Sequence, residues 1–202
     1  AADNFQGPAL AETAKGLGVK SVYILDDKQA YGLGVATYFK DAAKKLGIEI
    51  KGFAAYNTKT GTNYQALMQQ IGATHPDAIM VGGLICENGG QLIKDKVAVL
   101  GDNSKVKLQG PDGFYGYPDL LKLPESEGMY LSFAGAPPEE LQKAGGAGEK
   151  LIAAFKSKYG KLPTGGYPMY GVAAVQVIMA GIAASDGTRK GVNTAVLSGS
   201  GV

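Results

Sequence analysis

Short apolar runs alternate with longer stretches of helical period between residues 20 and 134 of the chain. The apolar runs are near-continuous or alternate with polar residues, as expected of strands in a covered sheet. They predict strands at residues 21–25, 48–55, 78–81, 106–109 and 128–133. Strands that alternate with helices in this way are typical of a parallel sheet covered by helices.

The segments that flank these strands carry the apolar stripes of amphipathic helices. In residues 31–46 one stripe includes Val35, Phe39 and Ala43, and Gly47 follows as a natural C-terminal cap. Further helices are predicted at residues 8–17, from 62 or 63 to 72, and at 91–100. The predicted fold class is therefore α/β: a doubly wound parallel sheet in a flavodoxin-like three-layer sandwich, with ligands at the carboxyl ends of the strands.

The pattern changes after Gly135. Two prolines and two glutamates at residues 137–140 suit a helix start, because proline tolerates the first turn and carboxylates favour the positive end of the helix dipole. No further strand is expected, and helices are predicted at residues 139–159, with a break near 145–146, and at 167–184. We therefore predict one domain at residues 1–134, and a hinge with helices at residues 135–202 that must dock on something else. The last residues show no closing element, so we expect the chain to be cut there rather than complete.

The segment at residues 167–184 is apolar enough to raise the question of a membrane span. Pro168 near its start, Gln176 in its middle and small residues throughout favour a buried helix instead.

Composition and charge narrow the class of protein. Hydrophobic residues make up 45% of the chain and charged residues 19%, which is typical of a soluble globular protein. The 20 basic and 18 acidic residues are spread along the chain, so no footprint for nucleic acid is expected. One cysteine, Cys86, excludes an intrachain disulfide. The first residues lack the basic start and apolar run of a signal peptide, and we interpret them as a processed, trimmed or engineered start rather than as evidence of a cytoplasmic protein.

The usual parts of a nucleotide, catalytic or metal site are missing. Gly32 and Gly34 resemble the first glycines of a dinucleotide loop, but several residues separate them from the strand and two carboxylates there would repel a pyrophosphate. The only histidine, His75, precedes a proline in a turn and is expected at the surface. Asp26 and Asp27 have no histidine or cysteine to join them. We predict no cofactor, no metal and no catalytic residue.

Polar and aromatic residues do stand at the carboxyl ends of the predicted strands. Tyr31 follows the first strand, Leu84 lies in the turn after the third, and Asp112 follows the fourth. Tyr167 opens the last predicted helix. A single carboxylate among apolar and phenolic groups suits capture of an ammonium group, because a desolvated charge needs a compensating charge. Asp112 also lies in a Pro-Asp-Gly sequence, which is a standard turn, and both interpretations stay open.

Five sequence segments together resemble a known family, the type I periplasmic binding proteins of the leucine/isoleucine/valine class. They are Gln6-Gly7-Pro8-Ala9, the run at residues 26–34, the run at residues 76–83, Gly110-Pro111-Asp112-Gly113 and the run at residues 170–176. The resemblance implies two α/β lobes that close over a small-molecule ligand and present it to an ATP-driven membrane permease, the partner in an ABC transporter. It also implies export to the periplasm or cell exterior, with a lipid anchor as one form of the full-length protein.

In that family, Tyr31, Leu84, Asp112 and Tyr167 would line the second lobe's side of the cleft, and Asp112 would hold the α-ammonium of an amino acid. Leu84 replaces an aromatic residue and Asp112 a longer glutamate, which leaves aromatic or other carboxylate ligands open. The resemblance further implies that the opening half of the first lobe is absent. We therefore expect weak or no amino-acid binding by this chain alone.

Two other function classes stay open. A ligand-sensing receptor domain could use the same fold and would differ in the segments that follow it. A nucleotide-dependent enzyme on a Rossmann-like sheet ranks last because of the loop spacing described above.

Overall fold

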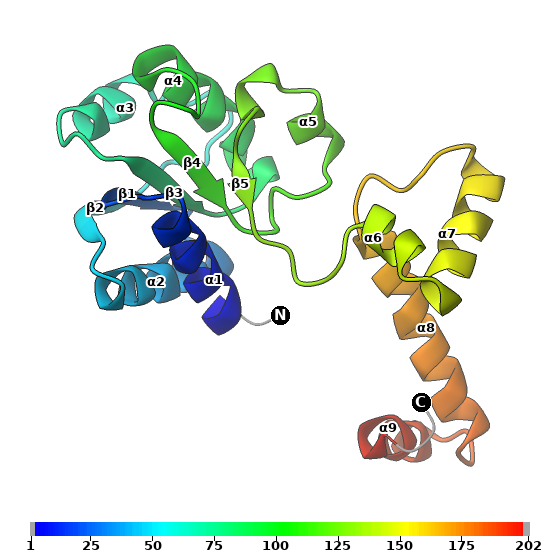
Figure 1. Cartoon of the computed structure of the whole chain (residues 1–202). Coiled ribbons are helices and arrows are strands. Elements are labelled where there is room, and N and C mark those ends of the chain that lie inside the picture. Colours follow the sequence, from blue (N-terminus) through cyan, green and yellow to red (C-terminus); the bar gives the residue numbers. More distant parts are fainter. Residues whose placement is uncertain (1–2, 200–202) are drawn as a thin grey trace. The chain divides into compact units, whose positions relative to one another are not determined.

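The computed structural model describes residues 3–199 (Figure 1). The chain divides into two compact units, Ala1–Ala134 and Gly135–Val202, which are called the first and second units.

The first unit is built on a five-stranded sheet with the strand order β2-β1-β3-β4-β5, and every neighbouring pair is parallel. The strands are β1 (Ser21–Asp26), β2 (Glu49–Ala55), β3 (Ala78–Gly82), β4 (Lys107–Gly110) and β5 (Tyr130–Leu131). This order is the doubly wound, flavodoxin-like one, so the predicted fold class is confirmed. Each predicted strand is present, although β5 is much shorter than the run predicted for it.

Helices cover the two faces of this sheet. On one face lie α1 (Asp3–Gly16) and α2 (Ala30–Lys45), and on the other lie α3 (Gln65–Gly72) and α4 (Gly90–Leu100) (Figure 1). The short helices α5 (Pro118–Leu121), η1 (Ile85–Gly89) and η2 (Pro124–Ser126) follow strands β3 and β4. They were not predicted, because elements of three to five residues carry no measurable periodicity.

Two helix starts differ from the prediction. Helix α1 begins at Asp3 and runs through Pro8, so the proline does not mark its first turn. Helix α3 begins at Gln65, because the Asn63 side chain accepts a hydrogen bond from the Gln65 N–H at 2.9 Å and forms a turn there instead of a helix cap.

Side chains of the central strands alternate between two hydrophobic cores. Val22 and Ile24 of β1 pack on the face of α1 and α2, whereas Leu25 packs on the opposite face. In β3, Met80 and Val81 divide in the same way. All of these side chains are fully buried, and each contributes about 1.5–3 kcal/mol through removal from water. The near-continuous apolar runs in the sequence therefore reflect strands covered on both faces.

The second unit consists of helices α6 (Pro138–Lys143), α7 (Gly146–Tyr159), α8 (Tyr167–Ala183) and α9 (Arg189–Ser198). The break predicted near residues 145–146 separates α6 from α7, where Gly145 and Gly146 have positive φ angles of 75° and 67°. Helix α9 was not predicted. None of its residues is fully buried, and its start is marked by the Thr188 side chain, which accepts a hydrogen bond from the Gly191 N–H.

Helix α8 is not the buried helix that its apolar sequence predicted. Met169 and Gly181 are its buried residues, and a unit of four short helices is too small to cover the rest. Its exposed large apolar side chains are Tyr167, Tyr170, Val172, Val175, Val177, Ile178, Met179 and Ile182. Among residues 3–199, no helix has both the length and the apolar character needed to cross a bilayer.

Candidate ligand-binding site

The sheet has a topological switch point between β1 and β3. From β1 the chain crosses to β2 at one edge, and it returns to β3 on the other side of β1. The loops that leave the carboxyl ends of β1 and β3 therefore diverge, and ligands of doubly wound sheets bind in the crevice between such loops. Tyr31 follows β1 in the first turn of α2, and Leu84 follows β3 immediately before η1.

The turn after β4 closes onto these two loops at Gly113. The Gly113 carbonyl accepts a hydrogen bond from the Ile85 N–H at 3.1 Å. A Cβ atom at Gly113 would lie 2.6 Å from the Leu84 side chain and 3.3 Å from the Tyr31 ring. The same Cβ atom would lie 2.5 Å from the Gly83 carbonyl oxygen, which is backbone, so only glycine fits at this position and Tyr31 and Leu84 contact the backbone directly beside Asp112.

The Tyr31 hydroxyl donates a hydrogen bond to the Asp112 carboxylate, and its oxygen lies 3.1 Å from the side-chain amide of Gln6. The backbone around Asp112 is also a turn, because the Asp112 carbonyl accepts from the Tyr115 N–H at 3.0 Å. The turn predicted for Asp112 is therefore present, and its role in ammonium capture stays a prediction. The backbone makes the turn, and the turn directs the carboxylate toward Tyr31.

Three of the predicted site residues, Tyr31, Leu84 and Asp112, thus come together in the first unit, and each is partly buried. Tyr167 belongs to the second unit, where it is the first residue of α8 and is 43% exposed. The part that each residue takes in ligand binding stays a prediction.

Gln6 was not predicted as a site residue, although its segment contributed to the family resemblance. It is 4% exposed and lies near the start of α1. The sequence carries no signal for this role, because only the packing of α1 on α2 shows that the Gln6 amide is buried and needs a hydrogen-bonding partner.

The loop after β1 is held by its own carboxylates. Asp26 accepts a hydrogen bond from the Lys28 N–H at 2.8 Å, and Asp27 accepts one from the Gln29 N–H at 2.9 Å. These bonds turn the chain into α2 and fix the position of Tyr31. Within residues 3–199 no group of three His, Cys, Asp or Glu side chains could hold a metal ion. His75 is exposed in its turn, as predicted.

The segment after Leu84 is fixed by a partly buried polar network. The Asn88 amide donates to the Tyr64 hydroxyl at 2.8 Å and to the Lys59 carbonyl at 3.2 Å. The Asp95 carboxylate in turn accepts from the Tyr64 N–H at 2.7 Å. Helix α4 therefore anchors the loop of residues 57–64 and, through it, the η1 segment that positions Leu84.

The loop after β1 contains a carboxylate that is almost completely buried. Asp27 is 1% exposed, and its Oδ2 atom and the buried Tyr56 hydroxyl have no hydrogen-bond partner among the described residues. A Cβ atom at Gly83 would meet both groups. Burial raises the pKa of Asp27 above its ordinary value of 3.8. The hydrogen bond from the Gln29 N–H lowers this pKa by less, and the charge of Glu87 raises it further. Burial likewise raises the pKa of Tyr56, with the charge of Asp27 as the next cause.

Asp27→Asn is therefore expected to stabilise the chain at neutral pH, on the order of 1 kcal/mol, because the amide carries no charge to desolvate and can still accept from the Gln29 N–H. A raised pKa in the folded state means that wild-type stability falls as pH rises from the unfolded to the folded pKa. The advantage of the variant should accordingly be small near pH 4 and grow toward neutral pH. Urea unfolding at a series of pH values measures it.

The exposed Asp41→Asn substitution is the matched control, with an expected effect within about 0.5 kcal/mol. A difference between Asp27→Asn and wild type that stayed constant or shrank as pH rose would contradict this description of Asp27.

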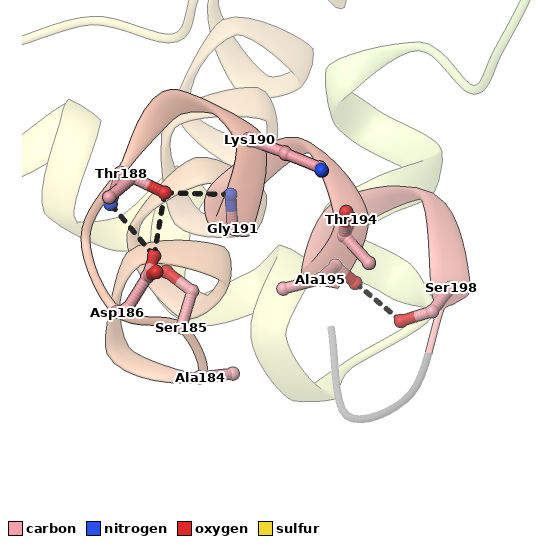
Figure 2. A pocket seen from close by; sticks show the side chains of 9 residues that line it. All are labelled: Ala184, Ser185, Asp186, Thr188, Lys190, Gly191, Thr194, Ala195 and Ser198. Carbon is pink, nitrogen blue, oxygen red and sulfur yellow. Dashed lines mark hydrogen bonds between the residues drawn. The ribbon is translucent and has the colours of Figure 1, made fainter.

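A shallow pocket of about 410 Å³ lies in the second unit between the end of α8 and α9 (Figure 2). Its polar groups serve the local backbone. Asp186 accepts from the N–H and the hydroxyl of Thr188, at 3.0 and 2.7 Å, and the Thr188 hydroxyl accepts from the Gly191 N–H at 3.1 Å. The pocket contains none of the predicted site residues, and these hydrogen bonds cap the start of α9.

A sequence model of the periplasmic binding proteins matches residues 2–199, nearly the whole chain. The chain belongs to the periplasmic binding protein family. The family resemblance stated from the sequence motifs is thereby confirmed. Among relatives of this periplasmic binding protein, the leucine-, isoleucine-, valine-, threonine- and alanine-binding protein of Pseudomonas aeruginosa is 30% identical over 186 residues. That match covers 89% of this chain and 46% of the relative.

Solved structures share the fold. A leucine-binding protein from Thermotoga maritima superposes with a TM-score of 0.81 at 24% identity, over 96% of this chain and 54% of that one. A solute-binding protein of an ABC transporter from R. palustris, in complex with benzoate, superposes with a TM-score of 0.77 at 19% identity, over 96% and 52%. This periplasmic binding protein chain thus spans about half the length of the proteins it matches.

Proposed function

We propose that this chain is part of the substrate-binding component of an ABC transporter and that its first unit supplies the ammonium-binding side of the ligand cleft. The observation that carries the proposal is the Asp112 carboxylate, which accepts a hydrogen bond from Tyr31 beside Leu84 at the switch point of the sheet. The ligand class is an amino acid or a related small organic acid, and the protein binds it without transforming it.

The chemistry of these three side chains supports an ammonium-bearing ligand. A carboxylate compensates the charge of an ammonium group once closure removes water from both, and the phenol keeps that carboxylate in place. The Tyr31 ring and the Leu84 side chain offer an apolar surface for the rest of a small molecule. Relatives that bear the names of leucine-binding proteins support the same class.

The other side of the cleft belongs, in this proposal, to the half of the protein that the relatives have in addition. Closure of two lobes over the ligand then buries it from both sides and creates the form that a membrane permease recognises. In the complete protein, the unit of residues 1–134 forms the second of the two ligand-binding lobes. The second unit contains the hinge, and the exposed apolar side chains of its helix α8 become covered when that helix packs on the other lobe. Such a protein works outside the cytoplasm, in the periplasm or at the cell surface.

Titration calorimetry on the complete protein tests the proposal with matched ligands. Leucine is expected to bind, and 4-methylpentanoate, which lacks only the ammonium group, is expected to bind at least about 100-fold more weakly, because closure would desolvate the charge of Asp112 with no ammonium group to compensate it. The 202-residue chain alone is the control and is expected to bind leucine weakly or not at all, since nothing closes over the ligand. Benzoate or 4-methylpentanoate binding as tightly as the best amino acid would overturn the proposed ammonium-binding role of the first unit.

A further inference from the structure

The hydrogen bonds at Tyr31 raise a question of proton count. Its hydroxyl oxygen lies within hydrogen-bond distance of two acceptor atoms, one from the Asp112 carboxylate and the other, 3.1 Å away, from the Gln6 amide oxygen. A phenol has one hydrogen and can donate to only one of them. The carboxylate is the stronger acceptor because it is charged, so the hydrogen belongs to the bond with Asp112.

The orientation of the Gln6 amide follows from this. With the phenol hydrogen directed at Asp112, an amide oxygen beside the phenol oxygen would place two lone pairs against each other. The nitrogen and oxygen ends of a glutamine amide are assigned from the hydrogen-bond network around them. The consistent assignment rotates the amide by half a turn, so that Gln6 Nε2 donates to the Tyr31 oxygen.

The position of Gln6 is imposed by the packing of α1 on α2. A Cβ atom at the neighbouring Gly7 would lie 2.5 Å from the Phe39 nitrogen and 2.8 Å from the Val35 carbonyl oxygen, so the two helices are in backbone contact. Gln6 itself is 4% exposed, and water cannot readily replace its amide as a partner of Tyr31. Helix α1 therefore holds this amide beside the same helix that carries Tyr31.

We propose that Gln6 is a positioning residue for the ligand site, acting through Tyr31 on Asp112. Its N–H donates to the phenol oxygen, the phenol donates to the carboxylate, and each bond polarises the next. The chain of bonds keeps the carboxylate in one rotamer, which matters because a binding group that is displaced by a fraction of an ångström loses much of its effect. The consequence for affinity rests on the proposed function, whereas the contact itself does not.

The test uses the complete protein and two measurements, the NMR signal of the hydroxyl-bearing ring carbon of Tyr31 and the dissociation constant for leucine. Gln6→Leu is expected to shift the Tyr31 signal and to weaken leucine binding about tenfold. In a Tyr31→Phe background, Gln6→Leu should change affinity less than about twofold, because the residue it acts through is gone.

Gln109→Leu is the matched control. Gln109 is a fully buried glutamine whose amide donates to the Leu10 carbonyl of the same helix α1, at 3.3 Å, and not to Tyr31. It is expected to leave both the Tyr31 signal and the affinity unchanged. If Gln109→Leu shifted the signal as Gln6→Leu does, movement of α1 would explain both results and the inference would be overturned.

Two further outcomes decide the matter. An unchanged Tyr31 signal in Gln6→Leu, or an equal loss of affinity with and without the Tyr31 hydroxyl, overturns the inference. A wild-type protein that binds no ammonium-bearing ligand overturns the proposed function instead, and a Tyr31 signal that still responds to Gln6→Leu, but not to Gln109→Leu, then supports the contact on its own.

Discussion

Asp112→Asn in the complete protein is expected to weaken the binding of leucine by at least about 100-fold, since loss of one member of a buried charge pair costs about 2–5 kcal/mol or more. The amide has the shape of the carboxylate and can still accept the hydrogen bond from Tyr31, so the substitution removes the charge and little else. Binding of 4-methylpentanoate, which has no ammonium group, should not weaken. Calorimetry with both ligands separates the loss of charge from a general disturbance of the cleft.

Asp119→Asn controls for the loss of one negative charge from the same unit. Asp119 is exposed in α5, and its substitution is expected to change neither the affinity nor the unfolding temperature. Leucine affinity within about threefold of wild type in Asp112→Asn would reduce Asp112 to the turn residue that its Pro-Asp-Gly sequence also describes.

Gly82→Ala is expected to destabilise the chain by about 3 kcal/mol or more and to displace the loop that carries Leu84. A Cβ atom at this position would overlap the carbonyl oxygen of Gly32 and would lie 3.0 Å from the Ala36 Cβ atom. Gly32 is backbone in the first turn of α2 and cannot rotate away as a flexible side chain would. The close approach of these two glycines is what places Tyr31 of α2 beside the loop after β3.

The corresponding control is Gly16→Ala at the end of α1, where a Cβ atom would meet nothing within 4 Å. This variant is expected to be as stable as wild type or more stable by up to about 1 kcal/mol, because alanine favours a helix over glycine. Urea unfolding of the chain measures both substitutions. The same midpoint for Gly82→Ala and wild type would show that α2 and β3 are not in the contact described.

The sequence predicted the sheet well because the first unit covers both faces of its central strands. Val22 and Leu25 are buried on opposite faces, so β1 appears in the sequence as an apolar run that needs no knowledge of its neighbours. The start of α1 was not predictable in the same way. Pro8 usually marks a first turn, and here packing on α2 around Gly7 extends the helix before the proline.

The residues of the candidate site likewise divide into those that the sequence could predict and one that it could not. Tyr31, Leu84 and Asp112 could be predicted because each follows a strand, and the carboxyl ends of parallel strands meet at one edge of the sheet. Gln6 could not, because its contact with Tyr31 depends on how α1 lies on α2. The exposure of α8 was also beyond the sequence, since an apolar helix has the same pattern whether or not its partner is part of the same chain.

The most direct test of the proposed site is a crystal structure of the complete protein with bound leucine. The ligand is expected in the crevice at the switch point, with its ammonium nitrogen about 2.7–3.0 Å from an Asp112 carboxylate oxygen and its side chain against Tyr31 or Leu84. An ammonium group held elsewhere, with no ligand atom in contact with Asp112, would contradict the account.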